Sequence, residues 1–207
     1  IKDDIQNQTL LEGVVRGADR LHEIVNNMID ITKIDSQVLK LNKAPFRMSD
    51  LFVRLSQYYE PALAERNLTL EIDDLSQLPM IQADAGLLQK VFLQLVMNAI
   101  KYTPDGGRIR ISNRIDRDKN MLEMVIADTG IGIDPEQIEL IFQKFYQTGQ
   151  VALHSTSQIK FKGGGPGLGL PIALGIVTAH GGKIWSESPG YNEQTCPGSK
   201  FFVQLPL

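Results

Sequence analysis

The sequence predicts one long amphipathic helix followed by a layered domain in which strands and helices alternate. In residues 9–34 apolar side chains recur at spacings of three and four, which is the period of a helix. From residue 46 onward, short apolar runs of strand type alternate with helical segments. Of the 207 residues, 43% are hydrophobic and 22% are charged, which is typical of a globular domain and excludes a disordered chain.

The first helix carries one apolar stripe that needs a partner helix. The first residues supply no such partner, and the pattern already runs near the start of the sequence. We therefore expect a piece of a longer protein, or a helix that pairs with other chains, for which a homodimer is the simplest arrangement. The stripe consists of Leu11, Val14, Ala18, Leu21, Val25, Met28 and Thr32.

The layered domain is expected to follow a linker at residues 36–45. Runs of strands with helices between them favour layers over a helical bundle. Residues 147–165 are rich in Gly, Ser, Thr and Gln without a regular period, so a lid and a disordered segment both stay open. The expected strands cover residues 46–48, 68–72, 80–82, 108–114, 121–127, 183–187 and 200–204, and the expected helices cover residues 51–65, 85–102, 135–141 and 168–179.

The charge and cysteine content narrow the class of partner. Lys and Arg number 21 and Asp and Glu 24, so the net charge of -3 gives no general attraction to nucleic acid or to an anionic membrane. No apolar stretch reaches the roughly 20 residues of a membrane span. The single cysteine, Cys196, cannot form an intramolecular disulfide, which fits a reducing, cytoplasmic compartment. We expect a soluble piece without nucleic acid or membrane contact.

The first candidate site is a polar stripe on the predicted helix 85–102. Asp84 is its expected N-cap, and the turn at residues 103–107 cannot continue it. Side chains at i, i+4, i+7 and i+8 share one face, and here they are polar. A solvated helix face explains this stripe, and so does a magnesium and phosphate site, because Mg²⁺ prefers oxygen ligands. The stripe comprises Gln94, Asn98, Lys101 and Tyr102.

The second candidate lies in residues 125–133, where an apolar strand ends in Asp128, Gly130 and Gly132. We refer to these residues as the G1 segment. Asp128 is expected to be partly buried, and a buried carboxylate needs a hydrogen-bond donor. That donor is either the backbone of its own turn or the exocyclic amino group of a base. Alternate glycines allow a close approach of the backbone to a ligand.

The third candidate, the G2 segment, is the glycine-rich stretch 163–170 that leads into an apolar helix. Backbone N–H groups at a helix N-terminus bind anions without any net positive charge. Pro171 fits only the first turn of that helix, which places the glycines at its start. Lys160 and Lys162 lie just upstream, and phosphate contact and simple solvation of the loop are both open for them.

In this order the three segments resemble the N, G1 and G2 boxes of the sensor histidine kinase catalytic domain. That domain belongs to the Bergerat-fold ATPase family, shared with gyrase B, Hsp90 and MutL. Residues 98–103 resemble the core of the N box and residues 142–146 the F box, while residues 20–30 are similar to the second helix of the kinase dimerisation domain. The resemblance implies an α+β fold, a two-layer α/β sandwich preceded by a long dimerisation helix. The implied domains are residues 1–35, a linker at 36–45, and a catalytic ATP-binding domain at 46–207.

The resemblance also implies roles for individual residues. Asn98 would coordinate Mg²⁺, and it is a candidate catalytic residue together with Gln94, for which holding a water and holding the metal shell both stay open. Asp128 would take the adenine amino group. The other residues implied to contact or border the nucleotide, beneath a lid at residues 147–165, are Lys101, Tyr102, Gly130, Gly132, Ile133, Phe145, Gly165, Gly167, Leu168 and Gly169.

The sequence departs from the kinase pattern at its histidines and at residue 94. His22 is followed by a partly matching segment, but Asn27 stands where the phospho-accepting motif has proline. We therefore interpret His22 as an ordinary helix-face residue and expect that this chain does not autophosphorylate alone. His180 ends a helix, where its partial charge suits the helix dipole. Gln94 replaces the glutamate of the hydrolysing relatives, and because glutamine is no general base, an ATPase of that type is disfavoured.

The function implied is transfer of the γ-phosphoryl group of MgATP to a histidine on a phosphoacceptor helix of the same protein that lies outside this chain. A response-regulator receiver domain would then take the phosphoryl group on an aspartate, and the full-length protein would be a homodimer. The alternative is a nucleotide-binding regulatory module, or pseudokinase, without transfer activity.

Overall fold

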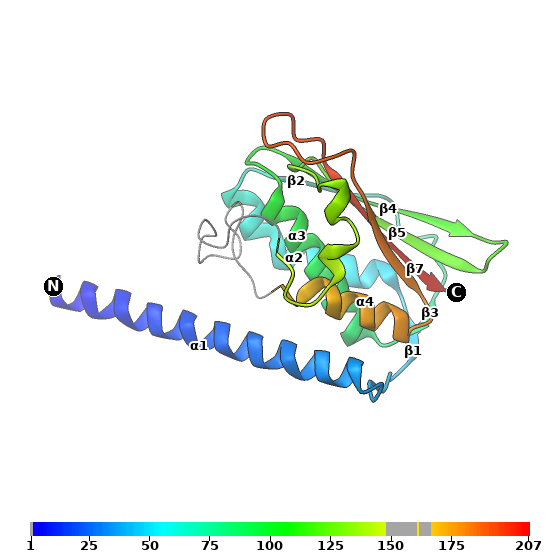
Figure 1. Cartoon of the computed structure of the whole chain (residues 1–207), viewed down its shortest axis with the longest axis horizontal. Coiled ribbons are helices and arrows are strands. Elements are labelled where there is room, and N and C mark those ends of the chain that lie inside the picture. Colours follow the sequence, from blue (N-terminus) through cyan, green and yellow to red (C-terminus); the bar gives the residue numbers. More distant parts are fainter. Residues whose placement is uncertain (1, 148–160, 162–166) are drawn as a thin grey trace. The chain divides into compact units, whose positions relative to one another are not determined.

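The computed structural model describes residues 2–147, 161 and 167–207. The chain divides into two compact units, Ile1–Leu39 and Lys40–Leu207, which are described separately. The first contains helix α1 (Lys2–Asp35), which begins before the predicted residue 9 because polar residues extend it beyond the apolar stripe (Figure 1). Several apolar side chains of α1 are exposed: Leu11, Val14, Leu21, Val25 and Met28.

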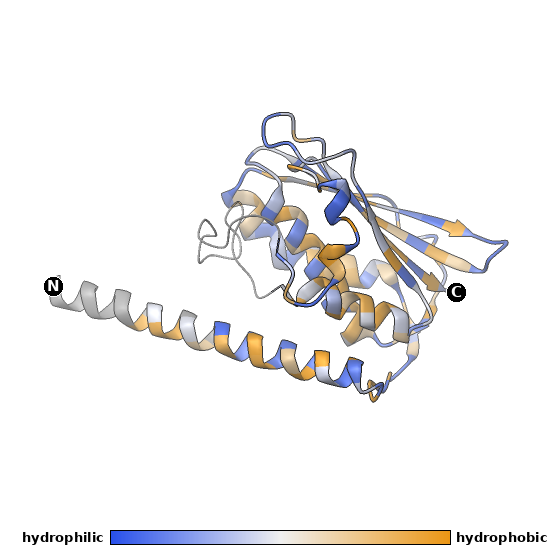
Figure 2. Ribbon diagram, in the orientation of Figure 1, coloured by the Kyte–Doolittle hydropathy of each residue, from blue (hydrophilic) through white to orange (hydrophobic). Residues whose placement is uncertain are grey.

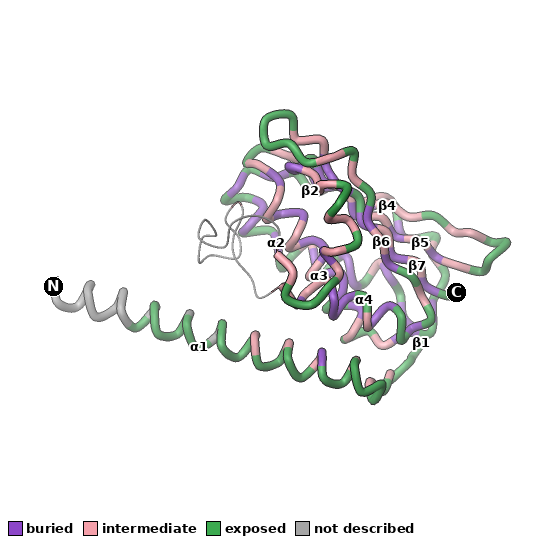
Figure 3. The backbone as a smooth tube through the Cα atoms, viewed as in Figure 1, coloured by how far each residue is buried: buried purple, intermediate pink, exposed green. Residues whose placement is uncertain are grey.

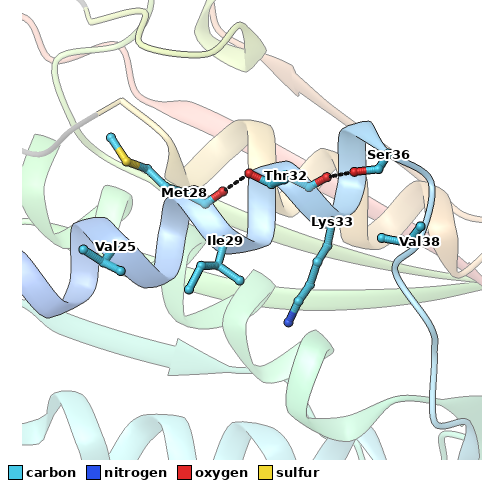
Figure 4. Close-up of a pocket in the computed structure, with 7 residues that line it drawn as sticks. All are labelled: Val25, Met28, Ile29, Thr32, Lys33, Ser36 and Val38. Carbon is cyan, nitrogen blue, oxygen red and sulfur yellow. Dashed lines mark hydrogen bonds between the residues drawn. The ribbon is translucent and has the colours of Figure 1, made fainter.

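A small apolar pocket lies at the C-terminal end of this first unit (Figure 4). Thr32 Oγ1 donates to the Met28 carbonyl at 2.8 Å, so this polar side chain is satisfied by its own helix. Gln37, with φ 55°, turns the chain after the helix, and the Val38 amide donates to the Lys33 carbonyl at 3.0 Å. The residues that line the pocket are Val25, Met28, Ile29, Thr32, Lys33, Ser36 and Val38.

The second unit is a five-stranded mixed sheet with three helices on one face, which confirms the expected two-layer α+β sandwich (Figure 1). Strands β2 and β4 are parallel and the other neighbours are antiparallel. The helices are α2 (Met48–Glu65), α3 (Ala85–Tyr102) and α4 (Gly169–Ala179). In sheet order the strands are β2 (Thr69–Ile72), β4 (Arg108–Asp116), β5 (Met121–Asp128), β7 (Ser199–Pro206) and β6 (Lys183–Glu187).

The hydrophobic core lies between the helices and the inner face of the sheet (Figures 2 and 3). Every second residue of β5 is buried, and each is paired with an inward residue of β7. The row ends with Asp128 opposite Ser199, both on the buried face. The register therefore places one carboxylate at the edge of an otherwise apolar core.

Helix α3 has the bounds that the sequence predicted. Asp84 Oδ1 accepts from the Leu87 amide at 3.1 Å, which is the expected N-cap. At the other end the turn after Tyr102 stops the helix. The face toward the core consists of Leu88, Val91, Phe92, Leu95, Val96, Ala99 and Ile100.

Several predicted boundaries were wrong. Strand β1 (Ala44–Phe46) begins two residues earlier than the strand expected at residues 46–48, within the expected linker, and it pairs with β3 (Ile81–Ala83) in a separate two-stranded sheet. Helix α2 begins at Met48 and not at residue 51, since Arg47 is its extended N-cap residue, and Met48 belongs to the core. The antiparallel pairing of β4 with β5, and of β5 with β7, carries these strands beyond their predicted ends.

The helix predicted at residues 135–141 is instead two short 3₁₀ turns, η1 (Pro135–Gln137) and η2 (Leu140–Phe142). Their amides bond three residues back, as Gln143 does to the Leu140 carbonyl at 2.9 Å, so no α-helical turn continues. No helix within the described residues is long and apolar enough to cross a membrane.

Candidate nucleotide-binding site

Asp128 ends strand β5 with its side chain buried at the sheet edge. Its Oδ1 accepts from the Gly130 amide at 2.8 Å and from the Ser199 amide at 3.3 Å. Burial raises the pKa of Asp128 to about 6, although the hydrogen bonds from Gly130 and Ser199 oppose that shift. Both amides contact the same carboxylate oxygen, and the Ser199 hydroxyl adds a side-chain hydrogen bond to this carboxylate.

The G1 segment lies directly against the end of α3. The Ile131 amide donates to the Tyr102 carbonyl at 3.1 Å. A Cβ on Gly130 would lie 2.5 Å from that carbonyl oxygen, so only glycine permits the contact. Two sequence motifs that were predicted separately are therefore joined through the backbone.

The loop between β6 and β7 forms the other boundary of the G1 segment. The Asn192 amide donates to the Ile131 carbonyl at 2.8 Å, and the Gly198 amide donates to the Gly130 carbonyl at 2.9 Å. Gly132 has φ +76°, and a Cβ there would lie 1.9 Å from the Gly190 carbonyl oxygen. The glycines of this segment thus have a packing reason within the protein, apart from any approach of a ligand.

Gln94 and Asn98 occupy successive turns of α3 and are both half-buried. Gln94 Nε2 donates to Asn98 Oδ1 at 3.0 Å, which orients the Asn98 amide. A Cβ on Gly169 would lie 2.0 Å from Gln94 Cδ, so the start of α4 packs on this side chain. The polar stripe of α3 is thereby brought to the N-terminus of α4.

The start of α4 meets the segment that resembles the F box. The Phe145 amide donates to the Gly167 carbonyl at 3.0 Å, and both residues have positive φ, 62° and +70°. Phe145 is 62% exposed, whereas Leu168 is buried. Leu168, the N-cap residue of α4, makes no side-chain cap hydrogen bond, and the first amides of a helix have no partner within the helix itself.

Of the remaining predicted residues, Lys101 and Ile133 have defined contacts, whereas Gly165 is not described. Lys101 Nζ lies 4.9 Å from the centre of the Tyr102 ring, a cation–π contact at the end of α3. Ile133 donates its amide to Ser188 Oγ at 2.9 Å. Gly165, Lys160, Lys162 and nearly all of the predicted lid at residues 147–165 lie outside the described residues.

Sequence reasoning missed Ser199, whose amide binds Asp128. A signal was present, because Ser199 is a polar residue at an inward position of an alternating strand. The predicted strand began one residue too late to include it.

Arg66 was also missed, and no local pattern would have found it. Its buried guanidinium donates to the carbonyls of Ile100 and Thr103, the latter at 2.6 Å, and to Asp105 at 2.8 Å. A cation on the last carbonyls of a helix is favourable, so Arg66 secures the C-terminal end of α3.

His180 ends helix α4 as predicted, but the partial charge expected for it is wrong. It is buried and accepts from the Asp84 amide on Nε2 at 3.0 Å, while Nδ1 lies 2.9 Å from the Ile176 carbonyl. An amide only donates and a carbonyl only accepts, so the ring is neutral with its proton on Nδ1. Burial lowers the pKa of His180, and Lys43 acts in the same direction.

The family follows from a direct comparison. Residues 83–207 match the model of the histidine kinase-, DNA gyrase B-, and HSP90-like ATPases, and the chain belongs to this family. The matched range contains α3, the G1 segment and the start of α4, the elements that meet at the site.

The relatives define the branch of the family. This chain is 29% identical over 212 residues to the autoinducer 2 sensor kinase/phosphatase LuxQ of Vibrio vulnificus, covering 99% of this chain and 23% of LuxQ. It is 33% identical over 207 residues to hybrid signal transduction histidine kinase D of Dictyostelium discoideum, covering 99% of this chain and 13% of that protein. The chain thus carries the ATP-binding catalytic domain of a sensor histidine kinase and spans less than a quarter of these relatives.

A solved structure shows the same fold. Full-length ShkA in complex with AMPPNP matches 96% of this chain and 38% of that chain, with a TM-score of 0.79 and 24% identity. Because the match covers 96% of this chain, it extends over most of α1 as well as the second unit.

Proposed function

We propose that this chain holds MgATP at the junction of α3, the G1 segment and α4, and presents the γ-phosphoryl group to a histidine on a phosphoacceptor helix outside the chain. A response-regulator aspartate would be the next acceptor, and the full-length protein would act as a cytoplasmic homodimer. The observation that carries the proposal is the Tyr102–Ile131 backbone contact, because it places the acceptor Asp128 beside the helix that bears Asn98.

The base would be recognised by Asp128. With a pKa of about 6 the carboxylate is charged at pH 7, so it would accept a hydrogen bond from an exocyclic amino group. The site would therefore prefer adenine over a base that has a carbonyl at the same position.

The phosphates and the metal would lie between α3 and the start of α4. Asn98 Oδ1 is a neutral oxygen ligand of the kind Mg²⁺ accepts alongside phosphate oxygens. It keeps a second lone pair beyond the one that binds Gln94, so the donor set fits. The amides at the start of α4, together with Lys101, suit the negative charge of the phosphates. Bound MgATP would supply the phosphoryl group and the cation that offsets its charge.

The transfer needs no base at residue 94. A bond forms between an imidazole nitrogen and the γ-phosphorus, the bond from that phosphorus to the β–γ bridging oxygen breaks, and ADP leaves. The neutral imidazole nitrogen attacks with its lone pair, and the proton on the other ring nitrogen is released to solvent. Gln94 then has the task of orienting Asn98, and its inability to activate water disfavours hydrolysis.

A phosphotransfer assay with labelled ATP tests this proposal. The chain alone should gain no acid-labile phosphate, whereas a longer protein with the first dimerisation helix in cis should become labelled, because the effective concentration of imidazole rises. In that longer protein Asn98→Ala should abolish labelling. The control is His22→Ala, an exposed residue of α1, which should label normally. Labelling of His22 would contradict the proposal, and nucleotide binding without any transfer would favour the pseudokinase alternative.

A further inference from the structure

Ser188, the residue after β6, makes more contacts through one hydroxyl than its small side chain suggests. Its Oγ accepts from the amides of Ile133 at 2.9 Å and Gly190 at 3.4 Å. The same oxygen lies 2.8 Å from the Gly198 carbonyl and 3.1 Å from the Gly190 carbonyl. A hydroxyl has one proton and two lone pairs, so two amides and one carbonyl saturate it.

These partners come from three separate segments. Ile133 belongs to the G1 segment, Gly190 to the turn after β6, and Gly198 to the turn before β7. The Gly198 turn contacts Gly130 through its amide, and the next amide, that of Ser199, donates to Asp128. The hydroxyl of Ser188 therefore bonds to the two segments whose amides orient the Asp128 carboxylate.

We propose that Ser188 is a positioning residue for base recognition, an inference that rests on the proposed nucleotide site. Its hydroxyl holds the G1 segment and the Gly198 turn in register, so that Asp128 meets the base with its carboxylate at a fixed position. Ser188 acts through Asp128 and Ile133 and needs no contact with the nucleotide.

The chain offers a matched control two residues away. Ser186 is also a serine of this segment, its residue is 5% exposed, and its Oγ is a buried polar atom without a hydrogen-bond partner in the described residues. Ser186→Ala removes the same atom as Ser188→Ala from the same stretch of chain. The two variants differ in whether the lost hydroxyl binds the G1 segment.

The experiment measures the affinity of the whole chain for ADP and for inosine diphosphate by calorimetry, with Mg²⁺ present. Inosine diphosphate lacks the exocyclic amino group that Asp128 would accept. Ser188→Ala should weaken ADP binding about tenfold, the effect of one lost hydrogen bond, and weaken inosine diphosphate binding much less. Ser188→Thr keeps the hydroxyl and should recover most of the affinity, and Ser186→Ala should bind both nucleotides as the parent does.

The outcomes distinguish a failure of the Ser188 inference from a failure of the proposed function. If the parent chain does not bind ADP, the proposed function fails. Suppose that the parent binds ADP. The positioning role then fails if Ser188→Ala binds both nucleotides as tightly as the parent does, or if its affinities for the two nucleotides fall by the same factor. Should Ser188→Ala not fold, Ser188→Cys, which keeps the shape with a weaker hydrogen-bonding atom, gives the same comparison between the two nucleotides.

Discussion

The side-chain amide of Gln94 donates to Oδ1 of Asn98 at 3.0 Å, and the same Gln94 side chain lies beneath Gly169 at the start of α4. The orientation of a proposed metal ligand on one helix is thus linked to the position of the neighbouring helix. Gln94 links them without being able to act as a base.

Gly169→Ala tests this link. The new Cβ would lie 2.0 Å from Gln94 Cδ, so Gln94 must move, at a cost of about 1 to 3 kcal/mol of unfolding free energy. Combining it with Gln94→Ala should restore stability, because the shorter side chain leaves room. Chemical denaturation of the two single variants and the double variant measures the coupling. Additive effects would show that the two residues do not press on each other.

Asp128→Asn should weaken nucleotide binding without lowering the free energy of unfolding at pH 7. Folding raises the pKa of Asp128 from 3.8 to about 6, so the folded state holds the proton more tightly, and stability falls as pH rises through this window. Asparagine removes that cost, which is about 3 kcal/mol at pH 7 for a shift of this size. The variant should be at least as stable as the parent at pH 7, with its advantage shrinking toward pH 3.8.

The same variant should bind ADP about tenfold to a hundredfold less tightly, because an amide nitrogen can face the base amino group as a second donor. Calorimetry at pH 7 measures this loss. An unchanged affinity would remove Asp128 from the site.

His180 should make the fold sensitive to acid. Burial lowers the pKa of His180 below its ordinary value of 6.5, so below that pH the unfolded chain binds a proton more readily than the folded chain does. The stabilisation that the neutral His180 ring gives to the folded state is fully present above pH 6.5. It is lost as the pH falls toward the pKa of His180 in the folded state. Protonation would place a second donor against the Asp84 amide, while the nearby Asp84 carboxylate favours the charged ring and Lys43 opposes it.

Urea titrations of His180→Gln and the parent measure this dependence. At pH 7 the variant should be less stable by about 1 to 3 kcal/mol, since glutamine cannot reproduce both hydrogen bonds. The gap should narrow below pH 6.5, because glutamine does not titrate. The Asp128 contribution is common to both proteins and cancels in the difference. A gap that is constant with pH would show that His180 titrates alike in both states.

Arg66→Met should destabilise the fold far more than Asp105→Ala, although the two residues form one ion pair. The Arg66 side chain is 6% exposed and binds helix carbonyls, whereas that of Asp105 is 74% exposed. Loss of the guanidinium leaves buried carbonyls without their donors, at about 2 to 4 kcal/mol, and loss of the exposed carboxylate costs under about 1 kcal/mol. Equal losses in thermal unfolding would assign the stabilisation to the ion pair.

The sequence by itself determined the elements whose signals are local. The bounds of α3 follow from the apolar period, the Asp84 cap and the turn after Tyr102, and all three lie within or beside the helix. Asp128 was predicted at a strand end because an apolar run stops there. The order of the motifs along the chain was enough to suggest the family, since motif order is a property of sequence.

Only the tertiary structure decided how these elements meet. The Tyr102–Ile131, Gln94–Gly169 and Ser199–Asp128 contacts join residues 29, 75 and 71 positions apart, and they depend on sheet register and helix packing. The period of a helix or strand gives the face of a side chain but not its partner, because the partner is fixed by elements elsewhere in the chain. For the same reason the sequence did not indicate that Arg66 binds the end of α3 or that His180 is neutral.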